Sequence, residues 1–466
     1  MHAPVSAAGS EVARPEVRRK GHLLRILGVG FGIAVVVGNT IGSGILLTPG
    51  EIAADLRNPW LVFAAWCGGG AFAFCCVQAI SELGTMLPRA GGWFVFSRRA
   101  FGEYGGFLVG CCDWMMILSG TAYLAAAFGE FAAGLAPSLR GREKLASIGC
   151  LLALTLVNWL GVRAGSRTQK ITSVAKAAAL VAFVAACFVI TPSAAPGAAV
   201  APHSLLGLPV AAVVVAIFAA LQPIVVTYDG WYGAIYFTEE DQDPARNLPR
   251  ASIIAVLACG AIYLLVNAAL LHVLPMGRLA GSAMPAADAA GAIFGSHGRD
   301  VILVISIVTV VSTINATLMI APRILFAMAR ERLMPDWIAA VNAGGTPNTA
   351  LLLCAGVSIG LVLSGSYDTL IAMASILYVA VYLSGFISLF VLRIRESDLP
   401  RPFKMWGYPW TNLGISLGAA VFLVAAIVAD LKHAAFTLVL AGLTYPLYLL
   451  GKRLRPSPDA AGANPE

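Results

Sequence analysis

Twelve long apolar runs account for most of this 466-residue chain. A run of about 17 to 25 mostly apolar residues is long enough to cross a bilayer as a helix. The composition agrees, because 59% of the residues are hydrophobic, 12% are charged and the mean hydropathy is +0.82, whereas about a quarter of the residues of a soluble domain are charged. We therefore predict an all-α integral membrane protein with 12 transmembrane helices, near residues 24–48, 60–83, 105–135, 145–162, 168–190, 208–237, 251–273, 300–328, 348–364, 369–392, 408–429 and 434–451.

The distribution of lysine and arginine tests this count and orients the helices. Lys and Arg accumulate in cytoplasmic loops. With both termini in the cytoplasm, 23 of the 31 Lys and Arg residues fall in inner segments, 7 fall in outer loops, and Lys176 alone lies within a helix. A miscounted helix would spoil this bias. We expect a multi-pass protein of the plasma or inner membrane, whose net charge of +7 requires no nucleic acid partner.

The two ends of the chain are polar. Residues 1–22 contain no short apolar run followed by a small-residue cleavage site, so we expect a cytoplasmic tail rather than a removed signal peptide. Residues 456–466 are rich in Pro, Ala, Gly and Asp. This composition predicts a disordered cytoplasmic tail.

Two of the apolar runs contain interruptions centred on glycine. The first run carries residues 42–45 (GSGI), and the sixth carries residues 228–231 (YDGW). Backbone groups that are freed inside a membrane must face protein, water or a polar ligand. Interrupted helices in corresponding halves of a chain therefore indicate a solute site. The alternative for the GSGI segment is a surface for close helix packing.

Patterns for catalysis or metal binding do not occur in the sequence. The nine cysteines form no CxxC pair and fall almost wholly inside predicted helices, where a free cysteine behaves as a small hydrophobic residue. The six histidines lack the spacing of metal ligands. No nucleophile elbow or Walker loop is found. We expect neither an enzyme nor a metal or cofactor site.

Four motifs follow one another along the predicted helices. They are residues 37–45 (VGNTIGSGI) with 48–50 (TPG); residues 228–231 with 238–240 (TEE) and 247–251 (NLPRA); residues 323–330 (RILFAMAR); and residues 399–404 (LPRPFK) with 407–410 (GYPW). In this order they resemble the amino-acid permeases of the amino acid–polyamine–organocation superfamily, above all the L-type amino acid transporter branch. The resemblance covers roughly residues 23 to 450.

The resemblance implies a LeuT-type fold built from a five-plus-five inverted repeat. Helices 1 and 6 would be broken, and the ten-helix core would span residues 23–393, with repeats at about 23–191 and 207–393. Helices 11 and 12, residues 394–455, would be peripheral. An odd number of helices in each repeat forces the two copies into opposite orientations, which agrees with the predicted topology.

The broken helices would bind a free amino acid through main-chain groups. An unpaired carboxylate or ammonium in apolar protein costs several kcal/mol. N–H groups at the start of the second half of helix 1 lie at a positive dipole end that suits a carboxylate, and carbonyls that end the first halves would accept from the ammonium. The residues expected to bind substrate are Thr40, Ile41, Ser43, Gly44, Ile45, Val226, Thr227, Tyr228 and Asp229.

Val226 departs from the family pattern. The matching position is usually a large aromatic residue that closes over the substrate. Valine leaves room for a bulkier substrate, or moves the gate to Trp231, Tyr228 or another aromatic side chain. Asp229 has an alternative role, because it could cap the exposed N–H groups beside the break.

Lys176 and Asp113 are charged residues predicted to lie deep in the membrane. Lys176 is about 12 Å into helix 5. The resemblance implies that its ammonium replaces the ion of sodium-driven relatives and contacts the helix 1 backbone and Ser312 or Thr313. This arrangement would argue against sodium coupling and permit proton coupling. A purely structural lysine is the alternative. Asp113 is a candidate for substrate or proton coupling, with a structural hydrogen bond as its alternative.

Glu239 and Glu240 follow helix 6 on the predicted cytoplasmic side. Ion pairs with nearby arginines would close an inner vestibule, although solvated loop charges are the commoner arrangement. The arginines predicted on the same side are Arg98, Arg99, Arg323 and Arg330.

We interpret the chain as a secondary active transporter of amino acids that works by alternating access. Exchange of neutral amino acids without sodium is favoured over proton-coupled uptake. A polyamine or amine-metabolite exchanger is an alternative that would use Asp113 or Asp229 for a second ammonium. A sensor or channel is a third class, but a channel should show a continuous polar stripe. We expect membrane lipid and the solute as partners, and no obligatory protein subunit.

Overall fold

The computed structural model describes residues 22–190, 210–365 and 367–453, with 210–215 and 367–375 described by their backbone alone. The described residues form helices and one isolated bridge between Leu27 and Asp241, so the predicted all-helical class is confirmed for them. Apart from His22, the predicted tails lie outside the described residues. The helices are α1 Val29–Thr40, α2 Gly44–Leu56, α3 Pro59–Met86, α4 Trp93–Leu135, η1 Pro137–Leu139, α5 Glu143–Trp159, α6 Val162–Val189, α7 Val210–Thr227, η2 Gly233–Phe237, α8 Pro244–Val273, α9 Met276–Ala280, α10 Pro285–Phe294, η3 Gly295–His297, α11 Gly298–Arg330, η4 Asp336–Ala339, α12 Asn348–Ser364, α13 Tyr367–Arg395, α14 Trp410–Ala429 and α15 Leu431–Arg453.

The first apolar segment is two helices rather than one. α1 ends at Thr40 and α2 begins at Gly44, and the two axes are bent by 49°. The backbone of Ile41, between them, is extended. The Ile41 amide still donates to the Val37 carbonyl, and the regular helix is then interrupted until α2 begins at Gly44. The sequence predicts an interruption at this point.

The sixth apolar segment is also interrupted. α7 ends at Thr227, the chain turns through residues 228–232, and the tighter helix η2 follows. Gly230 has a φ of +106°, which an L side chain rarely adopts. A Cβ on Gly230 would also lie 2.5 Å from the carbonyl carbon of Asn39. The glycine thus allows the unwound segment to touch the end of α1, and the two breaks lie against each other.

A helix lies at each of the twelve predicted apolar segments, but the helices differ in length. Eight of the described helices are long and apolar enough to span a membrane, or nine if α1 and α2 form one bent span. The α12 helix and the apolar part of α7, Ala216–Thr227, are shorter. Twelve crossings and the inverted repeat therefore stay predictions.

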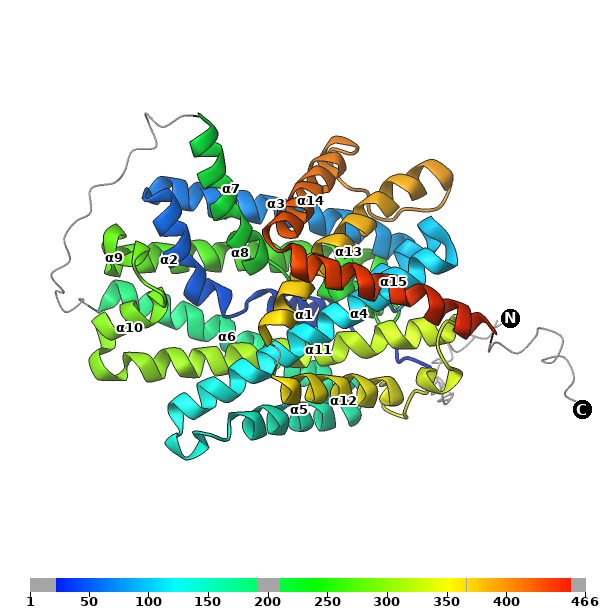
Figure 1. Cartoon of the computed structure of the whole chain (residues 1–466), viewed down its shortest axis with the longest axis horizontal. Coiled ribbons are helices and arrows are strands. Elements are labelled where there is room, and N and C mark those ends of the chain that lie inside the picture. Colours follow the sequence, from blue (N-terminus) through cyan, green and yellow to red (C-terminus); the bar gives the residue numbers. More distant parts are fainter. Residues whose placement is uncertain (1–21, 191–209, 366, 454–466) are drawn as a thin grey trace, which may run out of the picture.

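The long helix α4 packs against both α11 and α13, and α1 and α3 both pack on α8. Figure 1 shows α9 and α10 at one end of the molecule, and the last turns of α11 and α13 at the other. We call the latter the basic end, because α11 and α13 finish there with Arg330, Arg393 and Arg395. α14 and α15 expose many leucine and valine side chains, as expected of peripheral membrane helices.

The connection between α13 and α14 is held by a buried carboxylate of α3. Glu82 is 0% exposed and receives two hydrogen bonds from Arg393, at 2.8 and 2.6 Å, and one from the amide of Met405, at 2.7 Å. Arg401 Nε lies 3.3 Å from the same carboxylate, while its other nitrogens cap carbonyls at the end of α13. The LPRPFK motif therefore folds this loop onto α3.

We predict that Glu82→Ala strongly destabilises the protein. The change leaves two guanidinium groups without their carboxylate, and breaking a buried ion pair costs about 3–5 kcal/mol. Thermal unfolding of the purified protein in detergent measures the effect as a lower melting temperature. Glu396→Ala is the control, because the Arg99 partner of Glu396 is 53% exposed and such pairs contribute about 0–1 kcal/mol. Equal melting temperatures for the two variants would contradict this account.

Candidate functional site

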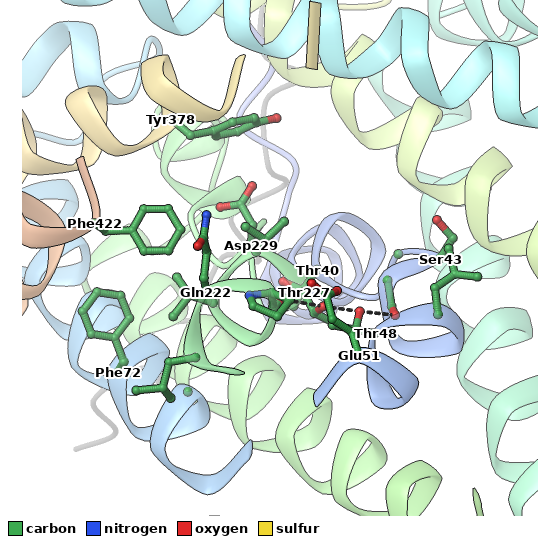
Figure 2. Close-up of a pocket in the computed structure, with 18 of the residues that line it drawn as sticks. Thr40, Ser43, Thr48, Glu51, Phe72, Gln222, Thr227, Asp229, Tyr378 and Phe422 are labelled. Atoms are coloured by element: carbon green, nitrogen blue, oxygen red, sulfur yellow. Dashed lines mark hydrogen bonds between the residues drawn. The ribbon is translucent and has the colours of Figure 1, made fainter. Parts of the chain in front are cut away.

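The two breaks face one cavity of about 1530 Å³. The cavity extends from the breaks along α2 to the connection between α9 and α10, which lies at the end of the molecule opposite the basic end. Figure 2 shows Thr40 and Thr227 near its centre, with Ser43 toward one side and Phe72 and Phe422 toward the other. Segments that are far apart in the sequence thus enclose a single space.

The amides that open α2 face this cavity. Ser43 is the N-cap of α2, and no side chain caps the N–H groups behind it. Ser43 and Gly44 line the cavity, whereas the Ile45 side chain is fully buried. An uncapped helix N-terminus carries partial positive charge and free donors. It can hold a carboxylate, as the sequence predicts.

The half-helices meet closely beside these amides. Thr227 Oγ1 lies 3.0 Å from Thr48 Oγ1 of α2 and bonds to the Pro223 carbonyl at 2.8 Å. A Cβ on Gly44 would stand 3.0 Å from that same oxygen. Glycine at position 44 therefore keeps the α2 amides open while the two helices touch.

The carbonyls at the ends of α1 and α7 are bridged by Tyr263 of α8. Its hydroxyl lies 2.8 Å from the Thr40 carbonyl oxygen and 2.9 Å from that of Thr227. One hydroxyl proton serves one carbonyl at a time, and each carbonyl oxygen has two lone pairs. Both carbonyls therefore retain capacity to accept from an ammonium group. Sequence reasoning missed Tyr263, because a single tyrosine in an apolar run carries no local signal of its partners.

Asp229 is the carboxylate nearest the breaks. It lines the cavity and accepts a hydrogen bond from Tyr382 of α13. Tyr378 and Tyr382, spaced four residues apart, both line the same wall, and this helical spacing is a signal that sequence reasoning overlooked. Glu51 and Asp55 of α2 also line the cavity, and no Lys, Arg or His among the described residues does so. The cavity is therefore acidic.

Val226 exposes its side chain to the cavity. Its exposed fraction is 58%, and it stands one residue before the end of α7. By contrast, the Tyr228 side chain points away, because its hydroxyl donates to the Trp66 carbonyl at 3.2 Å and it does not line the cavity. Ile41 is fully buried as well. Neither side chain lines the cavity, and the Ile41 amide and carbonyl already bond to Val37 and Lys176.

Lys176 is fully buried behind the break in helix 1. Its Nζ donates to the carbonyls of Gly38 and Ile41, each at 2.7 Å, and lies 3.5 Å from Thr313 Oγ1 of α11. These are contacts with the helix 1 backbone and with a helix 8 hydroxyl, as the resemblance implies. Ser312 instead bonds to side chains of α6. The lysine ammonium thus supplies hydrogen bonds to two carbonyls that the break leaves without a helical partner.

Comparison with known proteins identifies the chain. The profile of the family described as "Amino acid permease" matches residues 32–445. The chain belongs to the amino acid permease family. The resemblance inferred from the four motifs is therefore confirmed, and the permease is a multi-pass membrane protein and a transporter, not an enzyme.

Characterised relatives cover nearly all of the permease. The serine/threonine exchanger SteT of Bacillus subtilis (strain 168) is 26% identical over 443 residues, which are 93% of this chain and 98% of that protein. Large neutral amino acids transporter small subunit 2 of Homo sapiens is 30% identical over 426 residues, or 85% and 76% of the two chains. Asc-type amino acid transporter 1 of Mus musculus is 26% identical over 460 residues, or 94% and 83%.

Asp113 and Trp231 of the permease lie outside the cavity lining. Asp113 is fully buried on α4 and accepts from the Tyr236 hydroxyl at 2.8 and 2.9 Å. Trp231 packs behind Tyr382 and Phe386, with its ring nearly parallel to that of Phe386 at 6.3 Å. The geometry favours the structural alternative for Asp113. Trp231 can affect the cavity through the aromatic residues in front of it.

Ion pairs link the segment after η2 to α11 at the basic end of the permease. Glu240 pairs with Arg323, with both side chains almost fully buried, and Glu239 pairs with Arg330 through two bonds. Burial alone would raise the pKa of Glu239, but hydrogen bonds from Arg330 and from the Ala90 amide outweigh it and lower the pKa below its ordinary value. Arg98 pairs with Glu331 instead, and Arg99 with Glu396. Glu239 and Glu240 are therefore members of ion pairs and not solvated loop charges.

We predict that Gly44→Val lowers amino acid affinity at least 10-fold. The new side chain would meet Thr227 and cover the α2 amides. Scintillation proximity binding of a labelled amino acid to the purified permease measures the loss. Gly149→Val on α5 is the matched control, because an added Cβ at that position meets no atom within 4 Å. Unchanged affinity for Gly44→Val would refute the assignment of the carboxylate to these amides.

Proposed function

We propose that this permease exchanges neutral amino acids across the cell membrane by alternating access, without sodium. One observation carries the proposal: the uncapped start of α2 and the carbonyl ends of α1 and α7 all lie at the lining of one cavity. A free amino acid presents a carboxylate and an ammonium a few ångströms apart. Main-chain donors and acceptors at the ends of broken helices can match both charges.

The substrate would bind with its carboxylate at Ser43 and Gly44. Its ammonium would take the free lone pairs of the Thr40 and Thr227 carbonyls, assisted by the carboxylate of Asp229. This arrangement recognises the part of the molecule that all amino acids share. The substituent on Cα would then contact the walls of the cavity, beginning at Val226, and these contacts would set the selectivity.

Alternating access requires that one end open while the other is sealed. The cavity reaches the end that carries α9 and α10, which positive-inside topology makes the outside. At the basic end, the Leu27 amide donates to the Glu240 carbonyl at 2.9 Å, and the Gln242 amide donates to the Leu27 carbonyl at 2.9 Å. These bonds tie the residues just before α1 to the segment after η2, and the pairs of Glu239 and Glu240 tie that segment to α11. Release of that seal would open the site to the cytoplasm.

Lys176 supports independence from sodium. Carbonyls freed by a broken helix are the groups that coordinate sodium in transporters of this architecture. In this permease the carbonyls of Gly38 and Ile41 already bind an ammonium. A cation brought to the same place would meet a like charge, so we assign the lysine to the role of a built-in cation.

The protein is proposed to act without a covalently attached subunit. All nine cysteines lie within helices, so no loop offers a thiol for an intermolecular disulfide.

A second candidate function is exchange of diamines or other amine metabolites. The acidic lining of the cavity favours it, because Glu51, Asp55 and Asp229 could receive a further ammonium group. Asp113 cannot contribute directly, because it does not line the cavity.

Counterflow in proteoliposomes tests the proposal. Vesicles loaded with unlabelled alanine should take up labelled alanine several-fold faster than empty vesicles, and equally well in sodium or choline buffer. Uptake into empty vesicles that depends on an inward proton gradient would instead establish proton symport. Counterflow by diamines but not by alanine would establish the second candidate. A requirement for sodium would contradict the role given to Lys176.

We predict that Lys176→Ala reduces counterflow more than 10-fold while leaving surface expression largely intact. The variant leaves two carbonyls of the break without their donor, and an unsatisfied buried polar group costs about 1–3 kcal/mol. Lys170→Ala is the control on the same helix, because Lys170 is exposed. Wild-type counterflow by Lys176→Ala would remove the lysine from the mechanism.

A further inference from the structure

The cavity contains a second lobe that the ionic groups of a substrate do not use. This lobe lies where α3, α7 and α14 approach one another, away from Ser43 and the α2 amides. Figure 2 shows Phe72, Phe422 and Gln222 grouped on that side. The residues that define the lobe are Gly68 and Phe72 of α3, Leu221 and Gln222 of α7, and Gly418 and Phe422 of α14.

Small residues create the space. Gly418 is exposed on α14, and a Cβ added there would lie 3.2 Å from the ring of Phe72. Gly68 faces the lobe from α3. A larger residue at position 418 would therefore project into the lobe and against Phe72. The remaining walls are mostly apolar, so the lobe suits a hydrophobic group.

One face of α7 connects the lobe to the ionic site. Phe218, Gln222 and Val226 follow each other at intervals of four residues, and all line the cavity with Asp229 beyond them. Residues four apart lie on the same face of a helix. At 1.5 Å per residue, Gln222 is about 7.5 Å along the axis from Thr227. A long substituent on a ligand held at the break can reach it.

The opposite wall of the cavity is more polar. α4 and α11 contribute Tyr123, Thr313 and Thr317, and α13 contributes Tyr378 and Tyr382. A hydrophobic substituent on that side would lie against hydroxyl groups rather than against apolar carbon. The apolar lobe between α3, α7 and α14 therefore fits such a substituent better.

We propose that this lobe is an apolar subsite for the side chain of bulky amino acids, with Phe72, Gly418 and Phe422 setting the size limit. The proposal rests on the function proposed above, because it takes the carboxylate and ammonium to be bound at the breaks. Burial of a leucine- or phenylalanine-sized side chain strengthens binding by about 10- to 100-fold. Occupation of the lobe should therefore show directly in relative affinities.

Competition in the counterflow assay tests the subsite. Unlabelled alanine, leucine, phenylalanine and tryptophan compete with labelled alanine in wild type, Gly418→Leu and Gly414→Leu. Gly414 is the matched control: it lies one turn away on α14, is also exposed, and does not line the cavity. In Gly418→Leu the ratio of half-inhibitory concentrations for phenylalanine and alanine should rise about 10-fold or more. In Gly414→Leu it should stay at the wild-type value.

Phe72→Ala provides an opposite change, since it enlarges the lobe. Tryptophan should then compete better relative to alanine than in wild type.

The subsite is refuted if Gly418→Leu changes the inhibition by all four amino acids equally, or matches Gly414→Leu. This face of α14 would then contact lipid rather than substrate. Failure of wild-type alanine counterflow would instead refute the proposed function. Intact alanine counterflow with no competition by the large amino acids would refute the subsite alone.

Discussion

The structure depends on how the main-chain groups freed by two broken helices are satisfied in an apolar interior. An unpaired buried N–H or C=O costs about as much as a lost hydrogen bond. The Lys176 ammonium donates hydrogen bonds to the carbonyls of Gly38 and Ile41. The Tyr263 hydroxyl lies within hydrogen-bond distance of the carbonyls of Thr40 and Thr227. The Asn39 side chain donates to the Gly230 carbonyl at 3.2 Å. The breaks are therefore supported by donors on α1, α6 and α8.

This arrangement leaves a particular imbalance. The carbonyls of both breaks have donors, whereas the amides that begin α2 have no side-chain acceptor. The α2 amides therefore favour a negatively charged hydrogen-bond acceptor, and a carboxylate is such a group. Lys176 serves two purposes in this arrangement. The ammonium stabilises the carbonyls of the unwound segment and places a positive charge beside the break in helix 1, so the structural and functional interpretations of this lysine do not exclude each other.

The sequence predicted those features that local patterns encode. Glycines in apolar runs marked both breaks, and a lysine deep in an apolar run had to find buried acceptors, which proved to be backbone carbonyls. Glu82 and Tyr263 show the limit. The partners of Glu82 are more than 300 residues away in the sequence, and the two carbonyls that Tyr263 joins come from different helices. Which side chains meet across a bundle depends on helix packing, which no local pattern records; for the same reason Asp113 could be placed in a helix but not assigned to Tyr236.

Recognition by main-chain groups cannot distinguish one amino acid from another, because every amino acid carries the same carboxylate and ammonium. Selectivity must therefore come from the cavity walls. A large aromatic at position 226 would cover the substrate from α7, but the valine leaves that face open toward Gln222 and Phe218. With this barrier absent, the distance between α3 and α14 becomes the dimension that limits the side chain. The walls that select the substrate then belong to a peripheral helix and its neighbour, and they can vary in evolution without disturbing the hydrogen bonds that hold the breaks.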